Sequence, residues 1–82
     1  MPAPGGWFTC RVERTGPSED GKIYVWLTDQ GGTFNHWFYA MEAIQREILS
    51  TALTAISTGL LVDAYLRSTD PESEIARFYI RR

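Results

Sequence analysis

Few residues in this 82-residue chain have the side-chain chemistry that catalysis or metal binding requires. The chain has one histidine, His36, and one cysteine, Cys10, and the sequence offers no recognisable partners that would complete a hydrolytic triad or a zinc ligand set around them. Asp29, in the segment TDQGG, has the position of a turn-forming aspartate, and this segment lacks the length and the lysine of a phosphate-binding loop. We therefore expect a protein that is not an enzyme and that holds no metal or cofactor.

The chemistry that the sequence does offer is aromatic. More than half of its aromatic residues lie in one segment, KIYVWLTDQGGTFNHWFY, at positions 22–39. Two alternating runs flank Gly-Gly, which predicts a β-hairpin. A connection of two or four residues puts Phe34, His36 and Phe38 on the core face with Val25 and Leu27, whereas three residues would invert the assignment. The even connection keeps both phenylalanines inside, so we predict it, with His36 hydrogen-bonded within the fold.

The opposite face of the first three strands is the candidate functional surface. An exposed aromatic group of this size is typical of a contact site. It would serve as a subunit interface, as a stacking platform for single-stranded nucleic acid, or as a pocket for a small molecule or sugar. The formal net charge of −2 makes nucleic acid the less favoured partner. The residues assigned to this face are Trp7, Arg11, Tyr24, Trp26, Asn35, Trp37 and Tyr39.

Alternation and turn signals predict the elements that position this face. Strands are expected at 7–14, 23–28, 33–39, 60–67 and 75–82, with one helix at 40–59. No linker or repeat divides the chain, so residues 1–82 form a single domain. The order strand-strand-strand-helix-strand-strand favours a mainly β (α+β) fold, a five-stranded barrel like the OB-fold. An open sheet with the helix on one face is the alternative.

The predicted helix has two faces of interest. Its core stripe consists of Ile44, Ile48, Leu49, Ala52, Leu53, Ala55 and Ile56, while no side chain suited to capping marks its start. Its far side carries small residues, which allow a second helix to approach closely. We expect this side either to be simply solvated or to form a helix–helix contact between subunits. The residues concerned are Ala43, Ser50, Thr54 and Ser57.

The predicted architecture resembles the B subunits of cholera-type toxins. The segments that carry the resemblance are GKIYVWLTD and TFNHWFYA before the helix, and LLVDAYL and IARFYI after it. The resemblance covers most of the chain at the level of architecture and transfers no binding residue. It implies a ring of five subunits, with the helices lining a central pore and strands pairing across subunits.

Size and composition favour self-association as well. A chain this short has a thin core, and a lone cysteine rules out an internal disulfide as support. We therefore expect a homo-oligomer, with a pentamer favoured and any small-molecule or glycan site at the subunit interfaces. The start MPAPGGW lacks the charged and apolar regions of a secretory signal, and the charged residues of the helix argue against a membrane span. A cytoplasmic location is the expectation.

Overall fold

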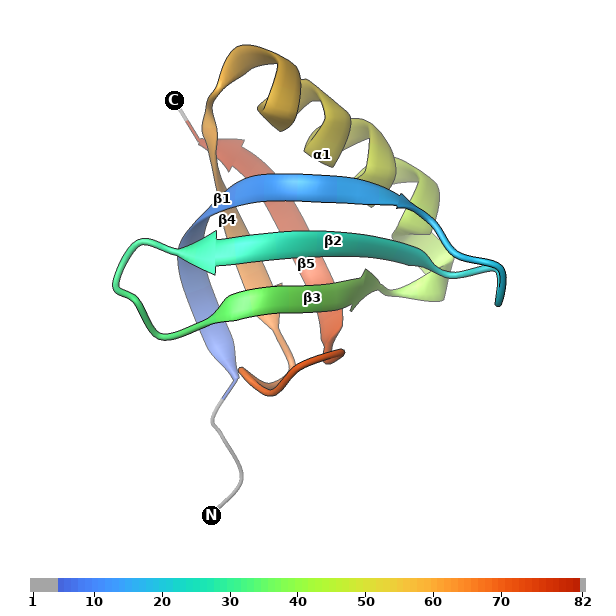
Figure 1. The fold of residues 1–82 in the computed structure, drawn as a ribbon, viewed down its shortest axis with the longest axis horizontal. Helices are drawn as coiled ribbons and strands as arrows, with labels where there is room; N and C mark the ends of the chain where they lie inside the picture. Colours follow the sequence, from blue (N-terminus) through green and yellow to red (C-terminus); the bar gives the residue numbers. More distant parts are fainter. Residues whose placement is uncertain (1–4, 82) are drawn as a thin grey trace.

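The fold is a closed barrel with one α-helix. The computed structural model describes residues 5–81, so residues 1–4 of the opening segment and Arg82 lie outside the description. The five strands close in the order β1-β2-β3-β5-β4 (Figure 1), which confirms the predicted five-stranded barrel and its order of elements. The elements are β1 (Gly6–Pro17), β2 (Ile23–Asp29), β3 (Asn35–Ala40), the 3-10 helix η1 (Glu42–Ile44), α1 (Gln45–Thr58), β4 (Leu61–Leu66) and β5 (Glu74–Arg81).

Strand β1 is longer than predicted because it belongs to both halves of the barrel. Its first part, Gly6–Cys10, pairs with β4, and its second part, Cys10–Pro17, pairs with β2. The sequence signals Gly and Pro predict a loop after position 14, but Pro17 is the last residue of the strand, where its missing N–H is tolerated. Barrel closure is completed by a short parallel contact between β3 and β5.

The β2–β3 hairpin has the predicted parity. Val25 is the cross-strand partner of Phe38, and Trp26 is the partner of Trp37. The backbone N–H of Asp29 donates to the carbonyl oxygen of Phe34 at 3.2 Å, so four residues form the connection. Val25 and Phe38 are fully buried, and the buried Asp29 carboxylate accepts a hydrogen bond from the Thr33 N–H at 3.1 Å, which confirms its role in the turn.

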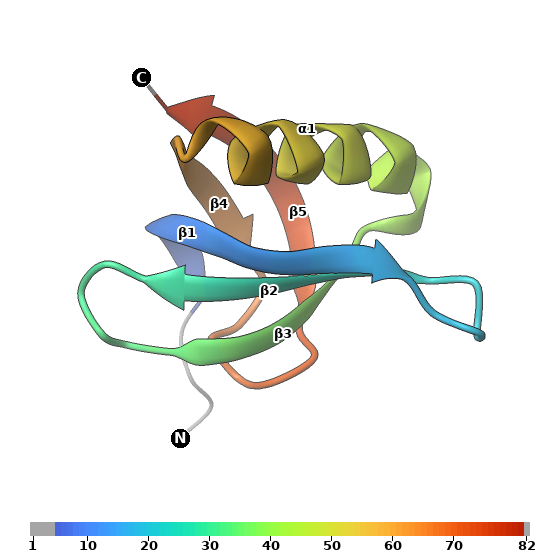
Figure 2. The same cartoon turned by 45° about the horizontal axis from the view of Figure 1, so that its top comes forward.

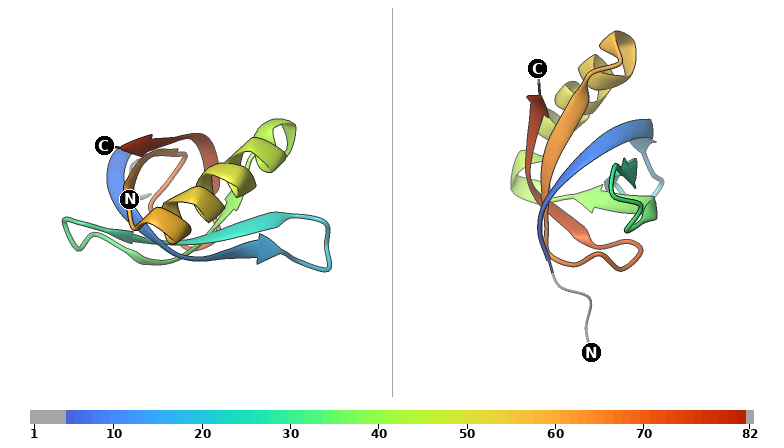
Figure 3. Two further views of the ribbon diagram at one scale, coloured as in Figure 1. Left: turned by 90° about the horizontal axis from the view of Figure 1, so that it is seen from above. Right: turned by 90° about the vertical axis from the view of Figure 1, so that its left-hand side faces the viewer.

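Helix α1 packs against β1, β2 and β5, as the views in Figures 2 and 3 show. It ends at Gly59, which has a left-handed conformation (φ 72°) and donates its N–H to the Ala55 carbonyl oxygen at 2.9 Å. This is the predicted C-terminal stop. At the other end the chain makes one 3-10 turn before α1, and no side chain caps either start.

The core face of α1 is narrower than predicted. Ile48, Ala52 and Ala55 are buried, but Leu53 and Ile56 keep 50% and 42% of their surface exposed. Both were expected in the core stripe, and that expectation is wrong. The two alanines let the helix approach the barrel closely, so only a narrow arc of side chains is covered. Among residues 5–81, no helix has the length and apolar character needed to cross a membrane.

Candidate functional site

Four aromatic side chains from β2 and β3 lie on the outside of the barrel, where the hairpin parity predicted them. They are Tyr24, Trp26, Trp37 and Tyr39, and we call this group the aromatic face. Trp37 lies between its neighbours, with its ring centroid 5.3 Å from that of Trp26 and 6.3 Å from that of Tyr24. Its plane is close to perpendicular to both, at 78° and 84°. Edge-to-face packing of this kind fixes the rings without covering them completely.

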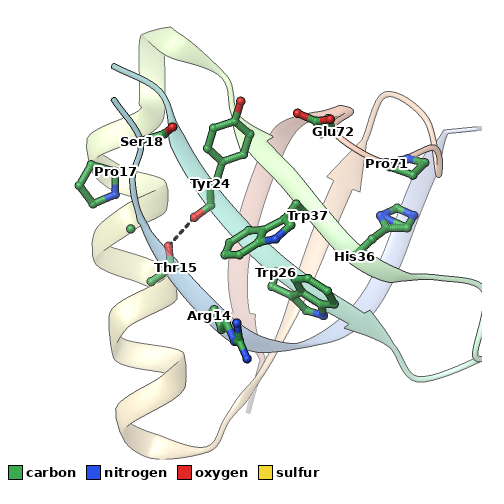
Figure 4. A pocket seen from close by; sticks show the side chains of 11 residues that line it. Arg14, Thr15, Pro17, Ser18, Tyr24, Trp26, His36, Trp37, Pro71 and Glu72 are labelled. Carbon is green, nitrogen blue, oxygen red and sulfur yellow. Dashed lines mark hydrogen bonds between the residues drawn. The ribbon is translucent and has the colours of Figure 1, made fainter. Parts of the chain in front are cut away.

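The aromatic face forms one wall of a hollow of about 800 Å³. The end of β1 and the start of the β1–β2 connection border it on one side, and the β4–β5 loop borders it on the other (Figure 4). A volume of this size is typical of pockets for small molecules. The hollow is lined by Arg14, Thr15, Gly16, Pro17, Ser18, Tyr24, Trp26, His36, Trp37, Pro71 and Glu72.

A β-bulge brings Arg14 to this site. The register of β1 against β2 skips Glu13, so Val12 pairs with Leu27 and Arg14 pairs with Trp26. Uninterrupted alternation from the buried Val12 would have turned Arg14 toward the core. Instead its guanidinium carbon lies over the Trp26 ring, 6.0 Å from the centroid. Arg14 was not among the residues assigned to the site, because a bulge leaves no mark in the alternation of β1.

A second cation lies over the far end of the aromatic face. The Lys22 ammonium is 4.7 Å from the centroid of Tyr39. Contacts of this length between a cation and an aromatic ring are attractive, because the ring face is electron-rich. Two of the four rings, Trp26 and Tyr39, therefore already carry a cation of the protein itself, while Tyr24 and Trp37 carry none among the described residues.

The rim next to Tyr24 is acidic. The Tyr24 hydroxyl donates to Asp20 Oδ2 at 3.2 Å, and the Lys22 backbone N–H donates to Asp20 Oδ1 at 3.0 Å. The backbone hydrogen bond is the main reason that the pKa of Asp20 is lowered, so its carboxylate is charged at neutral pH. Reduced hydration, followed by the negative charge of Asp20 and a smaller effect of Glu72, raises the pKa of the Tyr24 hydroxyl.

Glu72 enters the hollow from the β4–β5 loop with an unusual backbone. Its φ of 61° is in the left-handed region, the one such case among the non-glycine residues of 5–81. Its N–H donates to the Trp37 carbonyl oxygen at 2.8 Å, which holds the loop against the edge of β3. Left-handed conformations of residues other than Gly, Asn or Asp are uncommon and cluster at functional sites.

Arg11 and Asn35 lie on the same outer surface but are engaged with neighbouring groups. Trp26 Nε1 donates to Asn35 Oδ1 at 2.5 Å, and Arg11 Nε is paired with Glu13 Oε2 at 2.9 Å. The Thr28 hydroxyl is 3.0 Å from Asn35 Oδ1 and donates to it or to the Glu13 carboxylate. These polar contacts fix the Trp26 ring at the edge of the hollow.

Trp7 does not belong to the aromatic face, although the sequence assigned it there. Because the first part of β1 pairs with β4, Trp7 lies across from Tyr65, with ring centroids 5.4 Å apart, and its ring stacks on Tyr79 at 5.8 Å. It is 49% exposed and contributes to a different surface depression. The alternation of β1 gave the correct side of the strand, but not the neighbour that the strand has at that point.

His36 lies on the core side, as predicted, at one end of the barrel. Its ring packs beside both Phe34 and Phe38, with centroid distances of 5.6 and 4.7 Å, and these two rings also contact each other at 4.9 Å. Its Nδ1 atom is buried and has no hydrogen-bond partner among residues 5–81, so the predicted hydrogen bond is absent at this nitrogen. Within the same range, no group of three or more His, Cys, Asp or Glu side chains is placed to hold a metal ion.

The small residues assigned to the far side of the helix are all exposed. Ala43 lies in η1, whereas Ser50, Thr54 and Ser57 lie in α1. The Thr54 hydroxyl donates to the Ser50 carbonyl oxygen at 3.0 Å, and the Ser57 hydroxyl donates to the Leu53 carbonyl oxygen at 2.8 Å. These hydroxyl groups have their hydrogen bonds within the helix and therefore do not need water as a hydrogen-bond acceptor.

No protein-family model matches the sequence, and comparisons with curated proteins and with solved structures gave no match either.

Proposed function

We propose that the chain is a non-catalytic binding protein that takes a compact ligand in the hollow against the aromatic face. The observation that supports this most is that the rings of Tyr24, Trp26 and Trp37 line one hollow between two loops. The strand order also supports assignment to the OB-fold, whose ligands bind on the face of strands 2 and 3 between the corresponding loops. A cytoplasmic location remains part of the proposal.

The cations near the site favour a compact ligand over a nucleic-acid strand. Successive bases bind by stacking on free ring faces, and phosphates bind to unpaired cations. Here the guanidinium of Arg14 covers Trp26 and the ammonium of Lys22 covers Tyr39, while Asp20 and Glu72 add negative charge to the rim. These contacts leave a site for one ligand group, such as a single sugar ring or another small molecule, at Tyr24 and Trp37.

Tryptophan fluorescence tests this function directly. In a Trp7→Phe variant the remaining indoles, Trp26 and Trp37, both line the hollow. We expect saturable fluorescence changes with members of a panel of sugars and small amines, and loss of these changes in Trp7→Phe/Trp37→Ala. Salt-sensitive quenching by oligo-dT that is stronger than any small-molecule response would instead identify a nucleic-acid binder. Trp7→Phe alone is the matched control for folding.

Self-assembly is a second proposal, favoured by the surface of α1. Leu53 and Ile56 are exposed on one flank, and the small residues Ser50, Thr54 and Ser57 lie on the next. At roughly 100° per residue, the two flanks point about 100° apart around the helix axis. In a ring of five helices, the directions from one helix to its two neighbours are about 108° apart. The flank with Leu53 on one subunit can therefore pack on the small-residue flank of the next subunit. This geometry supports a homopentameric ring in which the α1 helices of neighbouring subunits contact each other.

Light scattering coupled to size-exclusion chromatography tests the assembly. We expect a mass near five subunits for the unmodified chain and a shift toward monomer for Leu53→Glu, because a charge would be buried in the contact. Gln30→Glu adds the same charge in the exposed β2–β3 connection and should leave the mass unchanged. A monomeric mass for the unmodified chain, or no effect of Leu53→Glu, would contradict the ring.

A further inference from the structure

The ring faces at the centre of the hollow form a corner. The plane of Trp37 stands at 78° to that of Trp26 and at 84° to that of Tyr24, and all three rings line the same hollow. Nearly perpendicular aromatic walls are the arrangement in which proteins bind methylated ammonium groups, since a cation gains from several electron-rich faces at once.

The protein already uses this surface to bind cations. Arg14 lies over Trp26, and Lys22 lies 4.7 Å from the centre of Tyr39. Trp37 and Tyr24, between these two rings, have no cation of the described chain over them. The central part of the aromatic face is thus the part at which an external cation would find a free ring.

Two carboxylates lie near Trp37 and Tyr24, the two rings that carry no cation of the described chain. Glu72 lines the hollow from the loop opposite β2, and its backbone is tied to Trp37 by the 2.8 Å hydrogen bond to the Trp37 carbonyl oxygen. Asp20, ionised and bound to the Tyr24 hydroxyl, adds a second carboxylate at the rim. Figure 4 shows Glu72 and Tyr24 on the same side of Trp37, with Arg14 on the other side of the hollow. Glu72 thus places a carboxylate on the side of the hollow away from Arg14 (Figure 4).

We propose that the hollow binds a trimethylammonium group against Trp37 and Tyr24, with Glu72 as its counter-charge. This inference rests on the proposed binding function and names its ligand class. The group is shared by choline-type small molecules and by trimethylated lysine, and the chemistry of recognition is the same for both.

The test compares choline with a neutral ligand of the same shape, and with trimethyl-lysine as the second source of the group. Choline, free trimethyl-lysine and the neutral isostere 3,3-dimethylbutan-1-ol are titrated into Trp7→Phe, with the indole N–H signals of Trp26 and Trp37 followed by NMR. We expect choline to bind at least about tenfold more tightly than the neutral isostere, the difference expected of a desolvated cation–π contact. The stronger of choline and trimethyl-lysine identifies the source of the group.

Two variants distinguish the loss of the proposed counter-charge from a general effect on the fold. Glu72→Gln keeps the size of the side chain and should weaken choline binding about fivefold while leaving the neutral isostere unaffected. Glu19→Gln is the matched control, because Glu19 is exposed and does not line the hollow. Equal affinities for choline and the isostere, or no effect of Glu72→Gln, would overturn the ammonium site but leave the hollow as a binding site. No response of either indole to these ligands or to the sugar panel would overturn both proposals.

Discussion

The backbone of Glu72 provides a prediction of unusual sign: replacing this glutamate by glycine should stabilise the protein. With φ at 61°, the backbone of Glu72 has a left-handed conformation, which costs a residue with a side chain about 1–2 kcal/mol. Glycine removes this strain, and its greater freedom in the unfolded chain costs about 0.5–1 kcal/mol. The hydrogen bond from the residue 72 N–H to Trp37 is retained, because it involves only the backbone.

The expected net gain is about 0.5–1 kcal/mol in the free energy of unfolding, which corresponds to roughly 3–6 °C in Tm for a domain of this size. Urea and thermal unfolding followed by circular dichroism measure it. The matched control is Asp70→Gly in the same loop, where φ is negative and the same entropy loss should destabilise the fold. If Glu72→Gly destabilises the protein as much as Asp70→Gly does, the strain argument is wrong. Under the ammonium proposal, the stabilised variant should also bind choline more weakly.

Three further predictions concern the core and the helix. Phe38→Ala should lower the free energy of unfolding by about 3–5 kcal/mol in urea titrations, because the ring is fully buried, whereas a surface Gln30→Ala should change it little. Gly59→Ala should cost about 1 kcal/mol in the same assay, since φ is 72° there, and Gly16→Ala, at negative φ, is its control. Burial, with smaller effects of Asp29 and Asp63, raises the pKa of the Cys10 thiol to about 12, so the native protein should resist Ellman's reagent at pH 8 until urea is added. Because the unfolded thiol ionises first, this group's contribution to stability is constant below about pH 9 and falls as the pH rises toward 12. Rapid native labelling at pH 8, or stability that rises across this range, would contradict the burial argument.

The sequence predicted best what depends on strict alternation. The sequence placed Val25 and Phe38 on the core side and Trp26 and Trp37 on the outer side, and the structure agrees. Side chains alternate along a strand with a period of two, and a four-residue connection keeps the two strands in the predicted register. Asp29 was correctly assigned to the turn for a local reason: its side chain bonds to the backbone of the same connection.

The wrong sequence predictions concern residues whose surroundings depend on contacts between elements that are distant in the sequence. Arg14 was left out of the assigned site residues because a bulge resets the alternation of β1 without any change in composition. Trp7 was assigned to the correct side of β1 but to the wrong neighbours, since β1 changes partner at Cys10. Leu53 and Ile56 were placed in the core because helical periodicity shows which side is apolar but not how wide the contact with the barrel is.

The parallel contact between β3 and β5 has a consequence for how the protein would respond to the proposed ligand. Only two residue pairs, Tyr39 with Glu74 and Ala40 with Ile75, join these strands directly, and the β4–β5 loop extends the join through hydrogen bonds to Trp37 and Tyr39. Because so few pairs join the strands here, we expect this seam to open more easily than the rest of the barrel and its amides to exchange with solvent before those of the central hairpin. A ligand held between Trp37 and Glu72 touches both sides of the seam. Ligand occupancy should therefore slow hydrogen exchange along β3 and raise the thermal stability of the whole barrel, with the affinity readable from the melting curve.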